Sequence, residues 1–96
     1  MREQMIINQK VESYYNMTNS LIASSCKNGK NNIMVNFAYA KIKDIPTMFY
    51  KEKKNIAKKV AYQVMLKLQQ CGYKTHISNN INTKSIDLTI SWETIN

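Results

Sequence analysis

Hydrophobic residues between positions 4 and 26 recur at spacings of three, four and seven, which predicts an amphipathic helix. The residues on this stripe are Ile7, Val11, Tyr14, Tyr15, Leu21 and Ile22. Thr18, Asn19 and Ser20 are weak helix formers, so the pattern leaves open a break at this point. We expect the helix to end within residues 26–30, where a lysine precedes an Asn-Gly pair that can adopt a left-handed conformation.

The helical periodicity is clearer between residues 48 and 71. Hydrophobic residues at four-residue steps are Ile56, Val60, Val64 and Leu68, flanked by Ala57, Ala61, Met65 and Cys71. Residues 44–47 are predicted to form the preceding turn, because Pro46 disfavours helix at Ile45 and can itself begin one. Gly72 is expected to end the helix.

Alternating hydrophobic and polar positions predict three β-strands, at residues 32–42, 73–78 and 85–92. A loop at residues 79–84 makes the last two a hairpin. The side chains expected to face the core are Ile33, Val35, Phe37, Tyr39, Tyr73, Thr75, Ile77, Ile86, Leu88, Ile90 and Trp92. On the third strand the outward set is Asp87, Thr89, Ser91 and Glu93. The alternate residues of the first strand are small or uncharged, which leaves open a partly covered second face.

The predicted element order is therefore α-β-α-β-β. It indicates an α+β fold in which a small three-stranded, mainly antiparallel sheet packs against two helices. The 96 residues correspond to a single domain, residues 1–96, with no internal repeat or linker. Two glycines and one proline are too few for an all-β sandwich or barrel with many tight turns.

The net charge of the chain bears on the kind of partner it binds. Fourteen basic residues against six acidic ones give a net charge of +8, which favours an anionic partner such as nucleic acid, an acidic protein or a membrane surface. Lys, Asn and Ile are unusually frequent, however, and their codons are A/T-rich. Part of the lysine excess can therefore reflect codon usage, and part can simply maintain solubility.

The basic residues concentrate between positions 41 and 59, where seven lysines accompany two acidic residues. Helical spacing places Lys51, Lys54 and Lys58 on one ridge with Lys59 beside it, an arrangement that suits contacts to nucleic-acid phosphates. The full candidate set is Lys41, Lys43, Lys51, Lys53, Lys54, Lys58 and Lys59. Because Arg2 is the only arginine, we expect backbone contacts rather than base readout. The alternative is a solvated helix face without a ligand.

Aromatic residues near the lysines raise a second possibility, a stacking platform for single-stranded nucleic acid. Phe37 and Tyr39 belong to the predicted core-facing set, however, so packing is the better interpretation. Further tyrosines and six methionines would instead suit a protein-contact surface.

The chain carries no pattern typical of an enzyme, a metal site or a cofactor site. His76 is the only histidine, and its strand position assigns it to the polar face, away from a partner nucleophile. Zinc requires about four closely paired Cys or His ligands, and only Cys26, Cys71 and His76 are present. Gly29 and Gly72 do not form a phosphate-binding loop. We expect a non-enzymatic protein without metal or cofactor.

The cysteines and the N-terminus bear on location. Two cysteines are too few for a disulfide framework, so we expect reduced thiols, Cys71 buried on the second helix and Cys26 near the end of the first; a single bridge between them is the alternative. The first eight residues do not form a signal peptide, and no apolar run could span a membrane. These features predict a cytoplasmic or virion location and no secretion.

The C-terminal half combines a lysine-rich helix, Gly72-Tyr73, a short hairpin and a closing Ile90-Ser91-Trp92. Over about 40 residues this arrangement resembles small orphan proteins of large DNA viruses and phages. The resemblance implies an accessory or virion-associated protein that acts by binding, and it implies no catalytic residue. Two functions stay open: binding of a nucleic-acid backbone, and a protein–protein, structural or host-inhibitory role without nucleic-acid contact.

Overall fold

The computed structural model describes residues 2–39 and 50–93 and confirms the α+β fold class. Five elements follow one another along the chain: α1 (Arg2–Lys27), β1 (Asn32–Ala38), α2 (Tyr50–Gln70), β2 (Lys74–Asn80) and β3 (Ser85–Ser91). The predicted turn at residues 44–47, the last positions of the predicted first strand and the first positions of the predicted second helix lie outside the described residues.

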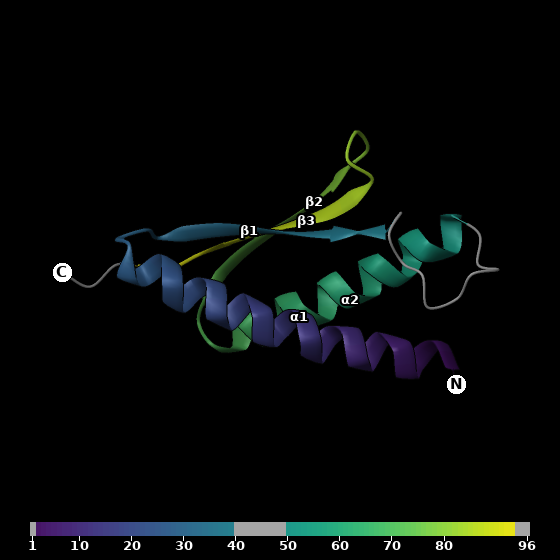
Figure 1. Cartoon of the computed structure of the whole chain (residues 1–96), viewed down its shortest axis with the longest axis horizontal. Coiled ribbons are helices and arrows are strands. Elements are labelled where there is room, and N and C mark those ends of the chain that lie inside the picture. The colour runs from purple at the N-terminus through teal and green to yellow at the C-terminus, as the bar shows by residue number, and fades with distance from the viewer. Residues whose placement is uncertain (1, 40–49, 94–96) are drawn as a thin grey trace.

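The three strands form one antiparallel sheet in the order β1-β3-β2, so the last strand of the chain is the central one. Both helices lie against the same face of this sheet (Figure 1). α1 contacts β1, and α2 contacts all three strands, β3 most extensively. The other face of the sheet, which we call the open face, carries no helix of the described chain.

The hydrophobic core fills the space between the helices and the sheet. From α2 it receives the predicted four-residue series together with both flanking alanines, and from the sheet it receives alternate residues of β1 and β3. The buried apolar side chains are Ile7, Val11, Ile22, Val35, Phe37, Tyr39, Ile56, Ala57, Val60, Ala61, Val64, Leu68, Ile86, Leu88 and Ile90. The hydrophobic spacing in the sequence therefore identified the core correctly for α2 and for the central strand.

Both helices end in the same way, as the sequence predicts. Gly29 and Gly72 have φ values of +75° and +93°, a left-handed conformation that glycine adopts without steric cost. Behind them, Lys30 N donates to Ser25 O at 2.9 Å and Tyr73 N donates to Leu68 O at 3.1 Å. These backbone bonds satisfy carbonyl groups that a helix end otherwise leaves unpaired.

Several boundaries differ from the prediction. α1 is continuous through residues 18–20, where a break was left open. Thr18 is buried, so this part of the helix packs against the rest of the protein. Leu21 is exposed although it was assigned to the apolar stripe. β2 extends to Asn80, which shortens the hairpin loop to residues 81–84. Asn80 causes this, because its Oδ1 accepts bonds from Asn82 N and Thr83 N and closes the turn early.

Cys71 was predicted to be buried and is exposed, because α2 ends at Gln70 and Cys71 belongs to the turn that follows. Its thiol lies 3.5 Å from the hydroxyl of Tyr15, and this hydrogen bond raises the pKa of Tyr15. Cys26 is exposed as well, eleven residues beyond Tyr15 on α1, a rise of about 16 Å. The two thiols are therefore free and too far apart for the alternative disulfide.

Candidate nucleic-acid interface

The described lysines of α2 point in several directions around the helix. Lys58, Lys59 and Lys67 are exposed, and Lys53 and Lys54 are half-buried. Partial burial of a lysine covers the aliphatic stem while the ammonium group stays in solvent. The side chain of Lys51 is not among those described, and Lys41 and Lys43 lie in the part of the chain that is not described. The structure therefore locates four of the seven predicted site residues.

One hydrogen bond fixes how this helix is turned relative to the sheet. Gln69 Nε2 donates to Thr75 Oγ1 on β2 at 2.8 Å. Lys58 precedes Gln69 by eleven residues, which is three helical turns, so both project from the same side of α2. Lys54 lies one turn before Lys58. Lys54 and Lys58 thus project from the side of α2 that meets β2 at Gln69, and we call these two residues the edge lysines.

Lys59 and Lys67 point elsewhere. A one-residue step turns an α-helix by about 100°, so Lys59 lies away from Lys58 and on the side of Glu52. Tyr62 and Leu66, both exposed, occupy the surface between these two directions. The ammonium group of Lys67 lies 5.2 Å from the centre of the Tyr15 ring on α1, a cation–π contact. The edge lysines therefore form a smaller group than the sequence predicts.

The open face of the sheet adds one cation next to this edge. The register places Lys74 beside Ser91 and His76 beside Thr89, with their side chains on the open face. Lys74 lines a shallow groove together with Glu93 and Trp92. Lys54 and Lys58 lie on α2, away from this groove.

The centre of the open face is closed by a buried carboxylate. Asp87 was predicted to point into solvent, but it is 5% exposed. Its Oδ1 accepts hydrogen bonds from Asn36 on β1 and from Ser85, both at 2.7 Å, and its Oδ2 accepts one from Asn80 on β2 at 3.2 Å. Thr83 in the hairpin loop lies 2.7 Å from Ser85 and extends the network.

Burial raises the pKa of a carboxyl group, but here the hydrogen bonds from Ser85, Asn36 and Asn80 outweigh that effect. The pKa of Asp87 is therefore below its usual value. Asp87 stays ionised and its hydrogen-bonding capacity is taken up by the three strands and the loop. This carboxylate is positioned to hold the sheet together and has no geometry for proton transfer to a ligand.

No Phe, Tyr or Trp side chain lies on the open face at any described strand position, which argues against a stacking platform for single-stranded bases there. Instead, Phe37 and Tyr39 are buried, and the rings of Tyr14 and Phe37 stack with centres 4.4 Å apart. Tyr73 and Trp92 meet edge to face at 6.2 Å. The described aromatic residues of the sheet are used mainly for packing, as the alternation of the sequence indicates.

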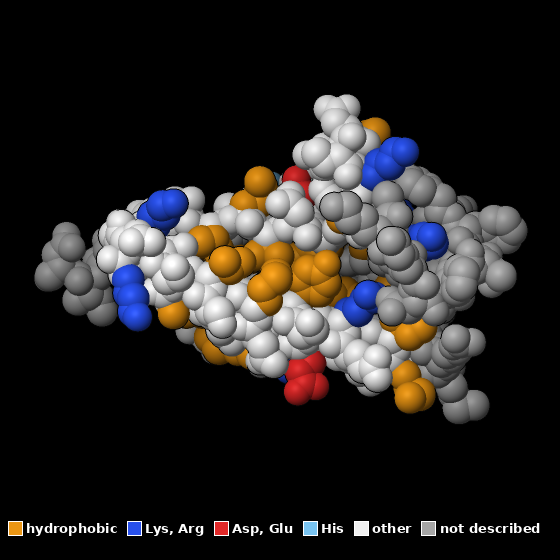
Figure 2. Space-filling model, viewed as in Figure 1, with side chains coloured by type: hydrophobic (Ala, Val, Ile, Leu, Met, Phe, Trp, Pro, Cys, Tyr) orange, Lys and Arg blue, Asp and Glu red, His pale blue; other side chains and the backbone are white. Residues whose placement is uncertain are grey.

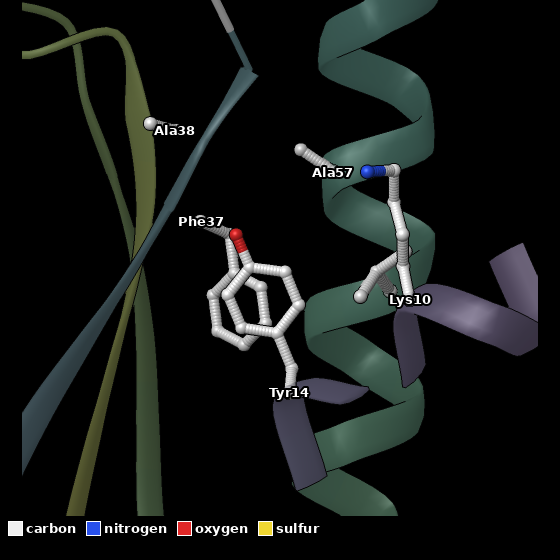
Figure 3. A pocket seen from close by; sticks show the side chains of 6 residues that line it. Lys10, Tyr14, Phe37, Ala38 and Ala57 are labelled. Carbon is white, nitrogen blue, oxygen red and sulfur yellow. The ribbon is translucent and has the colours of Figure 1, made fainter. Parts of the chain in front are cut away.

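A small cavity lies where Tyr14 and Lys10 project from α1 toward β1 and α2 (Figure 3). Its other walls are Phe37, Ala38, Ala57 and Val60. The free volume is about 20 Å³, which is room for a single water molecule. Such a cavity cannot hold a substrate or a cofactor, so a surface remains the better candidate for binding.

Within the described ranges no three His, Cys, Asp or Glu side chains gather as a metal site would require. Neither α1 nor α2 has, over its described residues, an apolar stretch long enough to cross a bilayer. Comparisons with protein-family models, with curated proteins and with solved structures found no match. The resemblance to viral orphan proteins therefore stays a prediction.

Proposed function

We propose that the protein binds the phosphate backbone of a nucleic acid along the edge formed by α2 and β2. The observation that carries the proposal is the direction of Lys54 and Lys58. The hydrogen bond between Gln69 and Thr75 places the C-terminal end of that side of α2 against β2, and the backbone positions of the two lysines are about 6 Å apart along the helix axis.

The described acidic residues leave this region positive. Glu52 precedes Lys54 by two residues, which places it on the opposite side of α2. Glu12 lies on α1 in the groove that faces Gln63 and Lys67. Asp87 is buried in its hydrogen bonds. Among these described carboxylates, therefore, none projects from the same side of α2 as the edge lysines.

The chemistry of lysine sets the kind of binding. An ammonium group is a compact point charge, whereas paired hydrogen bonds to a base edge or a phosphate are made best by arginine. The edge lysines accordingly suit contacts to phosphates with little sequence preference. Binding of this kind releases counterions and weakens steeply as salt increases.

The test is the salt dependence of binding to duplex DNA and duplex RNA. Log affinity is expected to fall with log salt by about 0.9 for each phosphate that is neutralised. Replacing both edge lysines, Lys54→Gln and Lys58→Gln, should reduce that slope by about 2 and weaken binding at about 50 mM salt. Glutamine keeps helix propensity, so the variant should fold normally.

The matched control removes the same charge elsewhere, through Lys27→Gln and Lys30→Gln at the end of α1. This variant should keep most of the affinity and most of the salt slope. Equal losses in both variants would show that net charge alone, and no particular surface, determines binding. Absence of binding by the wild-type protein at about 50 mM salt would overturn the proposal.

A protein partner is the second candidate, because Tyr62 and Leu66 are exposed on α2 between Lys58 and Lys59. Aromatic and aliphatic side chains rimmed by cations are typical of protein interfaces. Affinity capture with and without nuclease would separate the two functions. A partner that survives nuclease and is lost with Tyr62→Ser and Leu66→Ser would favour this second function.

A further inference from the structure

The outer edge of β1 has no partner strand among the described residues. Two backbone hydrogen bonds show which groups of β1 face the neighbouring strand β3 and not the outer edge. Tyr39 N donates to Lys84 O, and Trp92 N donates to Asn31 O. Odd-numbered residues of β1 therefore turn their N–H and C=O groups toward β3. The same groups of Met34 and Asn36 point outward, because neighbouring residues of a strand alternate. They present a ready-made ladder for another strand.

β1 lacks the features that usually protect an edge strand. Its seven residues, Asn32–Ala38, include no charged residue and no proline, whereas natural edge strands are commonly blocked by lysine, proline or a bulge. Met34 on this strand is 57% exposed. The opposite edge of the sheet contrasts with it, since β2 begins with the charged residue Lys74.

A row of α1 residues that begins with Lys10 and is otherwise uncharged continues this surface. Lys10 and Tyr14 line the small cavity beside β1, and Met17 and Leu21 follow on the same row of the helix. Both are exposed. Figure 2 shows apolar side chains gathered in the middle of this view, between β1 and α1, with the cations to either side. We call β1, Met17 and Leu21 together the β1 seam.

Charge and symmetry select the occupant of the seam. Each chain carries a net charge of +8, so two copies approach most closely across a surface with few cations. The residues of the β1 seam carry no charge, and Lys10, at the start of the same row of α1, lies at its margin. The seam also lacks the cations that would attract an acidic segment of another protein. A two-fold axis at Val35 pairs Met34 with Asn36 of the other copy, and both residues point their backbone groups outward. Ile33 then lies opposite Phe37 on the helix side.

We propose that β1 pairs antiparallel with β1 of a second copy about Val35, which joins the two sheets into one. The pairing keeps the helices of both copies on one face and brings Met17 and Leu21 of each α1 toward the other copy. A closed two-fold dimer satisfies both edges at once, because each copy uses the same surface. The interaction is independent of the nucleic-acid proposal, since the β1 seam includes neither edge lysine.

Sedimentation equilibrium of the full chain tests the pairing, with about 300 mM salt to screen the net charge. The expected result is a dimer that dissociates on dilution. Leu21→Lys should weaken dimerisation about a hundredfold, because it places like charges in the seam. The matched control is Leu66→Lys on α2: Leu66 is 51% exposed and Leu21 42%, so both variants expose one lysine, but only one lies in the seam.

Amide hydrogen exchange reads the register directly. In the dimer the amides of Met34 and Asn36 should be protected, and dilution or Leu21→Lys should remove that protection. A wild-type chain that stays monomeric up to about millimolar concentration would overturn the proposal. A dimer that is weakened equally by Leu66→Lys, or that leaves both amides unprotected, would overturn it as well. If the chain is monomeric and a foreign peptide protects the two amides, the edge serves another partner and self-pairing is wrong.

Discussion

Asn36 Nδ2 lies 2.7 Å from Oδ1 of Asp87, and this hydrogen bond joins the edge strand β1 to the central strand β3 across the open face. Asn80 on β2 bonds the other carboxylate oxygen. One buried carboxylate thus links all three strands. Protonation of Asp87 adds a donor where three donors already converge and removes the charge that strengthens these bonds, so stability should depend on the charge of this residue.

Acid should destabilise the fold through Asp87. Its pKa is lowered in the folded protein, against a value of about 3.9 in an unfolded chain. The unfolded state therefore takes up this proton at a higher pH than the folded state. The contribution is fully present above about pH 5 and is lost as the pH falls through 3.9 and then through the folded pKa. Urea unfolding between about pH 7 and pH 2.5 measures it.

Asp87→Asn isolates this effect from the other carboxyl groups. The side-chain amide introduced by this substitution would place an N–H donor next to the three donors that now bond the carboxylate. This should lower the unfolding free energy by about 1–3 kcal/mol at pH 7. The difference from wild type should shrink as the pH falls from about 5 toward the folded pKa of Asp87. A constant difference at every pH would show that the network acts through packing alone.

The sequence predicted this sheet better than it predicted this network. Alternation alone assigned Ile86, Leu88 and Ile90 to the core correctly, because strand periodicity needs only local residues. The same alternation placed Asp87 in solvent. Its burial depends on Asn36, which is 51 residues away, and on β3 lying between β1 and β2. Neither the pairing order nor the distant amide leaves a local signal in the sequence.

A similar limit applies to the lysines. Helical spacing correctly placed Lys54 and Lys58 off the buried side of α2. It could not show which flank faces the edge of β2, because the rotation of a helix on a sheet is set by tertiary contacts such as the one between Gln69 and Thr75. The prediction that Cys71 is buried was wrong for a related reason. α2 ends at Gln70, one residue earlier than predicted, so Cys71 lies in the following turn and not on the apolar stripe of the helix.

Val64 tests the core of α2. Its side chain is fully buried beneath the sheet, so Val64→Asp should unfold the domain, because an unpaired buried charge costs several kcal/mol. Leu66→Asp, two residues away and exposed, should change the melting temperature by only a few degrees. Circular dichroism during heating distinguishes them. A cooperative Val64→Asp melt close to that of wild type would contradict the assignment of the buried side.

The thiols of Cys26 and Cys71 are both exposed, so both should react with a thiol reagent in the folded protein at rates close to those of the unfolded chain. Cys26→Ser and Cys71→Ser should each change the unfolding free energy by less than about 0.5 kcal/mol, as surface substitutions usually do. Counting reacted thiols by mass spectrometry checks the first expectation. Protection of Cys71 until unfolding would mean that the turn after α2 is packed more tightly than described.

Thr18 in α1 is a position where a substitution should stabilise the fold. Its side chain is fully buried, and its Oγ1 has no hydrogen-bond partner in the described structure. An unsatisfied buried hydroxyl costs about 1–3 kcal/mol, and valine has nearly the same shape without that group. Thr18→Val should therefore raise the unfolding free energy by about 1 kcal/mol in urea titration. Thr89→Val on the open face makes the same chemical change at an exposed position and should have little effect. A Thr18→Val variant less stable than wild type would reveal a hydrogen bond to an internal water.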